Sequence, residues 1–277
     1  MSNHVQKNII AGFRSNKLAV AGVAAILIIV IASFFSFLYP VDPNALDVNA
    51  RLVSFRFNHP FGTDDMGRDY LARCLSGGRA SLICGFLAMI LSTLIGIVVG
   101  SVSGFIGGSL DAVLMRLVDA LMSLPTFLIM IVMNAYLKPG LGNVILIIGA
   151  LTWMNVARIV RGQTMALKER DYVVYSMVSG ERKAKIILTH ILPNMVPTII
   201  VTATINIAQA ILMESALSFF GLGVRPPAAS WGSMLSNAQQ YLTQAPWLAV
   251  FPGLLILITV ISFNYLGEAL RKVFEPK

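Results

Sequence analysis

Long stretches without any Asp, Glu, Lys or Arg limit what this chain can fold into. They cover residues 18–38, 80–110, 120–137, 139–157 and 226–267. A helix needs about 20 apolar residues to cross the roughly 30 Å of hydrocarbon in a bilayer. Only 12% of the 277 residues are charged, whereas about 25% are charged in a typical soluble domain. The sequence therefore predicts an all-α, polytopic membrane protein.

Polar segments between these stretches set the predicted organisation. The Pro-rich residues 39–43 end the first span, and the polar segment up to Arg79 holds five Arg and five Asp. Lys138, Pro139 and Gly140 indicate a tight hairpin. The predicted domains follow the chain. They are an interfacial helix at residues 1–17, the first span at 18–38, an extracytoplasmic loop at 39–79, the core at 80–267 and a cytoplasmic tail at 268–277. The core contributes five of six transmembrane helices, at residues 80–106, 115–137, 141–158, 196–217 and 247–267.

The basic residues indicate which side of the membrane each polar segment occupies. Six spans place both termini on one side, which carries 14 of the 21 Lys and Arg residues against seven on the other. Because basic loops stay cytoplasmic, we expect cytoplasmic termini and a cytoplasmic loop at residues 161–195. The basic residues that give the net charge of +8 lie near the ends of the spans. They therefore indicate topology and contact with anionic lipid rather than with nucleic acid.

Residue patterns for catalysis, metal binding or nucleotide binding are not recognisable in the sequence. Cys74 and Cys84 are too few for a disulfide framework, and the three His residues are too scattered for a metal site. We interpret His190 as a packing or backbone-bonding group. No G-x-x-x-x-G-K-[ST] sequence occurs, so another polypeptide would have to hold ATP and Mg²⁺. We expect no catalytic residue, cofactor or metal in this chain.

Four Gly residues recur at intervals of four within and just after the second predicted span. They are Gly96, Gly100, Gly104 and Gly108. This spacing places small residues on one helix face and lets another backbone approach closely. We interpret them as a helix-packing seam, with a gate or hinge as the alternative.

The fifth predicted span is the most polar of the six. Asn206, Gln209 and Met213 fall on one helix face, and Glu214 adjoins that face. A carboxylate near the end of a span is costly, and it is usually paired or faces a water-filled cavity. We expect this face to line a translocation pathway. For Glu214, hydrogen bonding to neighbouring helices and direct contact with substrate or a proton both stay open.

Several sequence matches occur in the same order as in one known family. The chain resembles the membrane permeases of bacterial ABC importers, specifically the dipeptide/oligopeptide/nickel permease family. The long match is HPFGTDDMGRD at residues 59–69, which is similar to that family's HPLGTDxLGRD signature. The other matches are FRSNKLA at 13–19, DYV with Gly180 and HILPN within 171–194, Glu214 with LSFFGLG at 217–223, and FNYLGEALR at 263–271.

The resemblance implies a type I ABC importer permease with the MetI-like fold in the bacterial inner membrane. Two ABC ATPase subunits would hold ATP and Mg²⁺, and a short coupling helix around residues 172–184 would transmit their motion to the spans. A second, homologous permease would form the other half of the pore. An extracytoplasmic substrate-binding protein would deliver cargo to residues 40–79 and 219–245. Trp231, Tyr241 and Trp247 would anchor the second of these segments at the membrane interface.

The resemblance also implies roles within the coupling loop. Gly180 would end the coupling helix in left-handed geometry, and Pro193 would begin the turn into the fifth span. Where the family usually has Glu-Ala-Ala, this chain has Val174, Tyr175 and Ser176, so the Tyr requires a reshaped ATPase cleft or a different tilt. The residues assigned to ATPase coupling are Asp171, Tyr172, Val173, Val174, Tyr175, Ser176, Gly180, His190, Pro193 and Asn194.

These matches leave the cargo open. Permeases with this signature carry peptides, nickel or metal chelates, and glutathione-like compounds, and the few charges in the predicted pathway favour peptides. An ion-coupled secondary transporter is the alternative from another class. It would need inverted repeats and several ionisable groups inside the membrane, and Glu214 alone is of that kind. A membrane-embedded enzyme would need a converging catalytic set, which is not recognisable.

Overall fold

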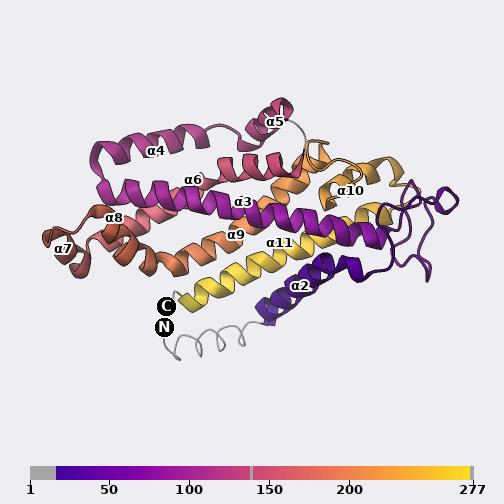
Figure 1. Cartoon of the computed structure of the whole chain (residues 1–277), viewed down its shortest axis with the longest axis horizontal. Helices are drawn as coiled ribbons and strands as arrows, with labels where there is room; N and C mark the ends of the chain where they lie inside the picture. The colour runs from indigo at the N-terminus through magenta and orange to yellow at the C-terminus, as the bar shows by residue number, and fades with distance from the viewer. Residues whose placement is uncertain (1–16, 138–139, 275–277) are drawn as a thin grey trace.

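A computed structural model describes residues 17–137 and 140–274 of the chain. Apart from two isolated β-bridges, every regular element in this part is helical. The helices are α2 (Lys17–Phe34), α3 (Tyr70–Ile106), α4 (Gly108–Met122), α5 (Thr126–Tyr136), α6 (Leu141–Lys168), α7 (Asp171–Val178), α8 (Lys183–Ile186), α9 (Leu192–Phe219), α10 (Trp231–Ala238) and α11 (Trp247–Phe274). The long helices run roughly along one axis, with α7 at one end of the bundle and α10 at the other (Figure 1). We call these ends the α7 end and the α10 end.

The described residues provide five helices that are long and apolar enough to cross a membrane. A sixth span results when α4 and α5, which bend by 82° between them, are taken together. The bend has a local cause, because Pro125 has no N–H to donate and disfavours a helical conformation at Leu124. The span predicted at residues 115–137 is thus a bent pair. It begins earlier than predicted, at Gly108, where positive φ values at Gly107 and Gly108 turn the chain away from α3.

α3 begins at Tyr70, inside the loop that the sequence predicts at residues 39–79. The Asp69 carboxylate caps the helix by accepting a hydrogen bond of 2.8 Å from its first turn. The charge of Arg73 is the reason that residues 70–79 resemble a loop in the sequence. In the structure, Arg73 Nε lies 3.5 Å from an oxygen of Asp64. A partner contributed by the folded loop therefore allows the charged residue to sit within the helix.

The predicted loop at residues 161–195 is mostly helical. α6 continues into it, and helical structure runs without interruption from Lys183 to Phe219. Only residues 169–182 lie between these long segments. Pro193 does not begin a turn, contrary to the prediction. A wide π-helical turn, Ile187–Ile191, directly precedes it and accommodates the proline ring and its missing N–H without ending the helix.

The two ends of the chain compare differently with the predicted domains. α11 continues well into the predicted tail at residues 268–277, so the described part of that tail is helical. Residues 1–16 lie outside the described residues, together with most of the predicted interfacial helix and of the match at residues 13–19. Lys138 and Pro139 of the predicted hairpin also lie outside them.

The closest helix packing joins α3 to α6. A Cβ built on Gly100 would lie 2.5 Å from the carbonyl oxygen of Ala157, and Gly96 and Gly104 approach α6 with similarly little space. The absence of side chains on these Gly residues therefore lets the two backbones come close together. Gly108 does not belong to this seam, because it starts α4 and has nothing within 4 Å of its Cβ position.

Candidate functional site

α7 packs one side against the bundle and exposes the other at the α7 end (Figure 1). Val173 is fully buried and Ser176 is nearly so, whereas Tyr175 is 75% and Val178 is 82% exposed. Large apolar side chains on a short helix that projects from a bundle indicate a surface for another protein. The predicted coupling residues exposed on α7 are Asp171, Tyr172, Val174 and Tyr175.

Gly180 ends α7 in left-handed geometry, with a φ of +77°. Its N–H donates to the Met177 carbonyl at 3.1 Å, and the Glu181 N–H donates to the Ser176 carbonyl at 3.2 Å. These two bonds form a Schellman motif, which favours Gly because other residues are strained at this φ. The chain therefore leaves α7 by a defined turn.

A group of polar side chains joins α7 to the segment that leads into α9. His190 Nε2 lies 3.3 Å from Ser176 Oγ and 3.5 Å from a Glu181 oxygen. Asn194 donates to the His190 carbonyl at 2.7 Å. The hydrogen bond that Lys185 donates to Glu181 lowers the pKa of that carboxyl below its usual value. His190 thus bonds within the helical connection.

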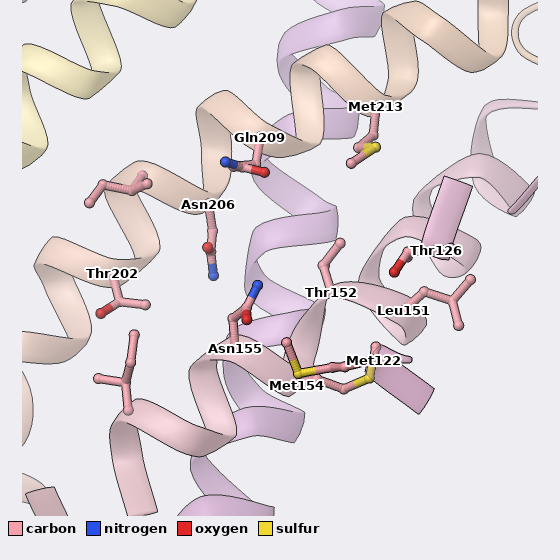
Figure 2. A pocket seen from close by; sticks show the side chains of 12 residues that line it. Met122, Thr126, Leu151, Thr152, Met154, Asn155, Thr202, Asn206, Gln209 and Met213 are labelled. Atoms are coloured by element: carbon pink, nitrogen blue, oxygen red, sulfur yellow. The ribbon is translucent and has the colours of Figure 1, made fainter. Parts of the chain in front are cut away.

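A cavity of about 290 Å³ lies between the α4–α5 pair, α6 and α9 (Figure 2). Asn206, Gln209 and Met213 lie on one face of α9, and all three line it. Asn206 Nδ2 has no hydrogen-bond partner within the described part of the chain. The remaining lining residues are Met122, Thr126, Leu151, Thr152, Met154, Asn155, Ile159, Thr202 and Ile205.

The α6 side of the cavity was missed in the sequence analysis. Thr152 and Asn155 line the cavity, and Figure 2 shows Asn155 and Asn206 close together on opposite walls. The available signal was a pair of polar residues inside the uncharged stretch 139–157. Every lining residue is uncharged, so the walls offer amides, hydroxyls and sulfur as contacts. Such groups suit a neutral polar ligand rather than an ion.

Glu214 does not line this cavity, although the sequence analysis grouped it with the pathway face. It is fully buried, and its carboxylate accepts hydrogen bonds from Ser81 Oγ at 2.9 Å and Ser218 Oγ at 2.6 Å. Successive helix positions are turned by about 100°, so Met213 can reach the cavity while Glu214 faces α3. Hydrogen bonding to neighbouring helices, one of the two alternatives, is what the structure shows.

Two ion pairs between α4 and α6 were also missed. Asp111 accepts hydrogen bonds of 2.5 and 2.6 Å from Arg161, and Arg158 pairs with Asp119. The predicted span at residues 141–158 ends at Arg158, and the predicted loop at residues 161–195 begins at Arg161. The acids in a largely apolar helix were the available signal, because such groups are usually paired.

The signature at residues 59–69 builds the loop that precedes α3. Asp64 accepts from the Arg68 backbone at 3.0 Å and from Arg68 Nε at 2.6 Å. Asp69, which caps α3, also lies 2.9 Å from His59 Nδ1. The charged residues of the signature therefore satisfy one another and fix the start of the helix.

Trp231 is not an interface anchor, contrary to the prediction. It is fully buried, and its indole N–H donates to the Cys74 carbonyl at 3.0 Å. Gly78 leaves room for the ring, because a Cβ there would lie 2.8 Å from it. Trp247 is only partly buried and packs near the Phe55 ring, with centroids 6.0 Å apart.

A helical membrane bundle with a neutral polar cavity and an exposed apolar helix at one end defines a membrane transport component. Residues 96–277 match the family described as binding-protein-dependent transport system inner membrane component. Residues 7–60 match the N-terminal transmembrane domain of oligopeptide transport permease C. The chain belongs to this family of multi-pass inner membrane permeases, so the predicted MetI-like fold is confirmed, with the bent pair as its sixth span.

Two curated relatives illustrate the similarity. The oligopeptide transport system permease protein OppC of Bacillus subtilis (strain 168) is 40% identical over 273 residues, which cover 98% of this chain and 89% of the relative. The protein of the same name from Haemophilus influenzae is 37% identical over 271 residues, covering 96% of this chain and 86% of the relative. The similarity thus extends along almost the whole chain.

Proposed function

We propose that the chain is the permease subunit of an ATP-driven ABC importer and forms half of a translocation pore for di- and oligopeptides. The observation that carries this proposal is the exposed apolar side of α7 in a member of this transport family. A second permease subunit would complete the pore. An extracytoplasmic binding protein would deliver peptides at the α10 end.

α7 has the properties of a docking helix for an ATPase subunit. Tyr175 and Val178 project from it, while the buried Val173 seats it on the bundle. ATP and Mg²⁺ would stay on the ATPase subunits, and this chain would supply no catalytic residue. The distribution of Lys and Arg favours a cytoplasmic α7 end with cytoplasmic termini. At the position of the family's first Ala, Tyr175 requires an ATPase cleft wide enough for its ring.

The cavity has the chemistry that passage of a peptide requires. Asn155, Asn206 and Gln209 each carry both donors and acceptors, which match the N–H and C=O groups of a peptide backbone. The uncharged walls offer no fixed charge that would retain one kind of side chain. The names of the relatives favour peptides over nickel or a metal chelate.

The docking role can be tested by placing a charge on the exposed side of α7. We expect Tyr175→Asp and Val178→Asp to insert normally and to lose peptide uptake and peptide-stimulated ATP hydrolysis together, because a buried, unpaired carboxylate opposes docking. Tyr136→Asp is the matched control, since Tyr136 is 86% exposed on α5, away from α7 (Figure 1). Full stimulation in the α7 variants would refute the docking assignment.

The cargo can be tested by competition for uptake. Cells that depend on this transporter should take up labelled di- and oligopeptides only when the ATPase subunits are intact. Excess unlabelled peptide should abolish the signal, and excess Ni²⁺ should leave it unchanged. ATPase-dependent accumulation of Ni²⁺ in place of peptide would overturn the peptide assignment.

A further inference from the structure

The buried carboxylate of Glu214 accepts hydrogen bonds from serine hydroxyls on both of its oxygens. Ser218 Oγ of α9 donates to Oε1 at 2.6 Å, and Ser81 Oγ of α3 donates to Oε2 at 2.9 Å. Glu214 has no solvent-exposed surface. A buried carboxyl group is stable only when its oxygens are hydrogen-bonded, so these two serines contribute directly to the stability of Glu214.

Each serine also accepts a backbone N–H from the chain beyond α9. The Val224 N–H donates to Ser218 Oγ at 3.4 Å, and the Trp231 N–H donates to Ser81 Oγ at 3.3 Å. A hydroxyl has a single proton, and in both serines that proton is committed to Glu214. Two relays therefore run from backbone N–H groups through serine hydroxyls to one carboxylate. They hold residues 220–231, which we call the outer segment, near its middle and at its end.

The outer segment fits closely against α9 at the Ser218 relay, and Gly232, the residue just after the segment, is also tightly packed against α9. A Cβ on Gly223 would lie 1.8 Å from Ser218 Oγ, and one on Gly232 would lie 2.4 Å from the Ser215 carbonyl oxygen. There is no space for the segment to shift while these contacts persist. Its position thus depends on the same serines that bind the carboxylate.

The outer segment lies beside the cavity at the α10 end. The Phe220 ring is 5.9 Å from the Phe127 ring of α5, measured between centroids. Leu222 packs against the same buried cluster as Met213, and its carbonyl accepts a hydrogen bond from Asn134 of α5. Movement of this segment would therefore disturb α5 and α9 where they border the cavity.

We propose that Glu214 is a positioning residue that clamps the outer segment onto α3 and α9 through Ser81 and Ser218. The clamp fixes the outer segment beside the helices that border the cavity and makes this segment move with α9. It needs an acceptor on both sides, which a carboxylate provides. A glutamine would present one NH₂ group, and the serine facing that group would lose the acceptor for its own hydroxyl proton. The link to cargo entry rests on the proposed function, whereas the clamp itself does not.

Cys74 provides a native probe for the clamp. It is 1% exposed. The Trp231 indole donates to its carbonyl, and the backbone N–H of the same Trp231 belongs to the Ser81 relay. Cys84→Ala leaves Cys74 as the one cysteine of the chain. In the assembled transporter in cells, the labelling rate of Cys74 by a membrane-impermeant maleimide then reports release of the outer segment from α3.

The Glu214→Gln and Ser81→Ala variants should raise this labelling rate on the order of tenfold, the factor expected for loss of a buried hydrogen bond. Ser218→Ala is the matched control. It removes the same hydroxyl from the other relay, so Cys74 should stay protected. In the double variant Glu214→Gln, Ser81→Ala, Cys74 should be labelled no faster than in the faster single variant, because both changes break the same Ser81 relay.

Two labelling results would contradict the clamp. Unchanged labelling in Glu214→Gln, or equal labelling in Ser81→Ala and Ser218→Ala, refutes the clamp. Labelling requires neither ATP nor cargo, so failure of the proposed function would leave these results intact. In uptake, Glu214→Gln should raise the peptide concentration for half-maximal transport and largely keep the maximal rate. Loss of maximal rate at unchanged half-saturation would indicate a general loss of structure and would overturn the positioning role.

Discussion

The two sides of α6 contact the rest of the molecule in different ways. Toward α3, the backbones approach so closely that a Cβ on Gly96 would lie 2.5 Å from Val156 Cβ. Toward α4 and α9, α6 borders the cavity, and its links to α4 include the ion pairs of Arg158 and Arg161. One side is therefore joined by direct backbone packing. The other combines side-chain packing, as between Ile148 and Leu217, with polar contacts around the cavity.

This difference indicates where the bundle can move. Close-packed helices can adopt only a few relative arrangements, because any shift creates overlaps or voids. Ion pairs and cavity walls can separate and re-form at smaller cost. We therefore expect α3 and α6 to move as one body, and any change in the pathway to occur between α6 and the α4–α5 pair or α9. The predictions below test this division.

The largest expected effect comes from filling the α3–α6 seam. Gly100→Ala places a methyl group 2.5 Å from a backbone carbonyl of α6, and overpacking of this kind costs about 3 kcal/mol where the neighbour cannot move. The thermal unfolding midpoint of the purified transporter should fall sharply. Gly162→Ala is the control, since Gly162 lies in α6 with nothing within 4 Å of its Cβ position. It should be neutral or slightly stabilising. Equal effects of the two changes would show that the seam is not rigid.

An intermediate effect is expected on the opposite side of α6. Asp111→Asn replaces one of the two oxygens that accept from Arg161 with an NH₂ group and leaves the partly buried Arg161 without its carboxylate, at a cost of about 2 kcal/mol. Asp119→Asn breaks the more exposed pair, with side chains 45% and 53% exposed, and should cost less than about 1 kcal/mol. Thermal unfolding of both variants measures the difference. If Asp111→Asn destabilised the protein more than Gly100→Ala, the division of α6 into a rigid and a separable side would be reversed.

The sequence predicts the bundle better than it predicts the contacts that decide this comparison. Uncharged stretches identify spans because the bilayer excludes charge, and the Gly spacing identifies three of the seam residues correctly. The start of α3 was missed because Arg73 is compensated by Asp64, whose position depends on the folded loop. The orientation of Glu214 was left open, since helical spacing alone cannot say which neighbour lies on each side. The α4–α6 ion pairs join residues far apart in the sequence.

A smaller effect on stability, but a clear chemical signal, is expected at the cavity. Asn206→Cys and Gln209→Cys should be modified by small water-soluble thiol reagents, with less than about 1 kcal/mol lost on unfolding, because neither side chain is fully buried. Leu212→Cys is the control on another face of α9, where Leu212 is 46% exposed without lining the cavity. Its thiol should react far more slowly in a bilayer. Uniform protection of all three would mean that the cavity holds no water and that the α9 side of α6 is as closed as the seam.

The smallest effect is expected where α7 leads into α8, because an exposed ion pair contributes little beside the packing of Val173. The hydrogen bond from Lys185 lowers the pKa of Glu181. A lowered pKa means that the pair stabilises the fold above the ordinary glutamate pKa and loses this contribution as the pH falls through the lowered value. Thermal unfolding of Glu181→Gln should therefore differ slightly from the parent at neutral pH and converge with it in acid. Glu268→Gln, which breaks the equivalent pair with Lys272 on α11, controls for loss of a surface charge. A large loss in Glu181→Gln alone would show that α7 is held by charge. The contrast drawn for α6 between packing and polar contacts would then not extend to α7.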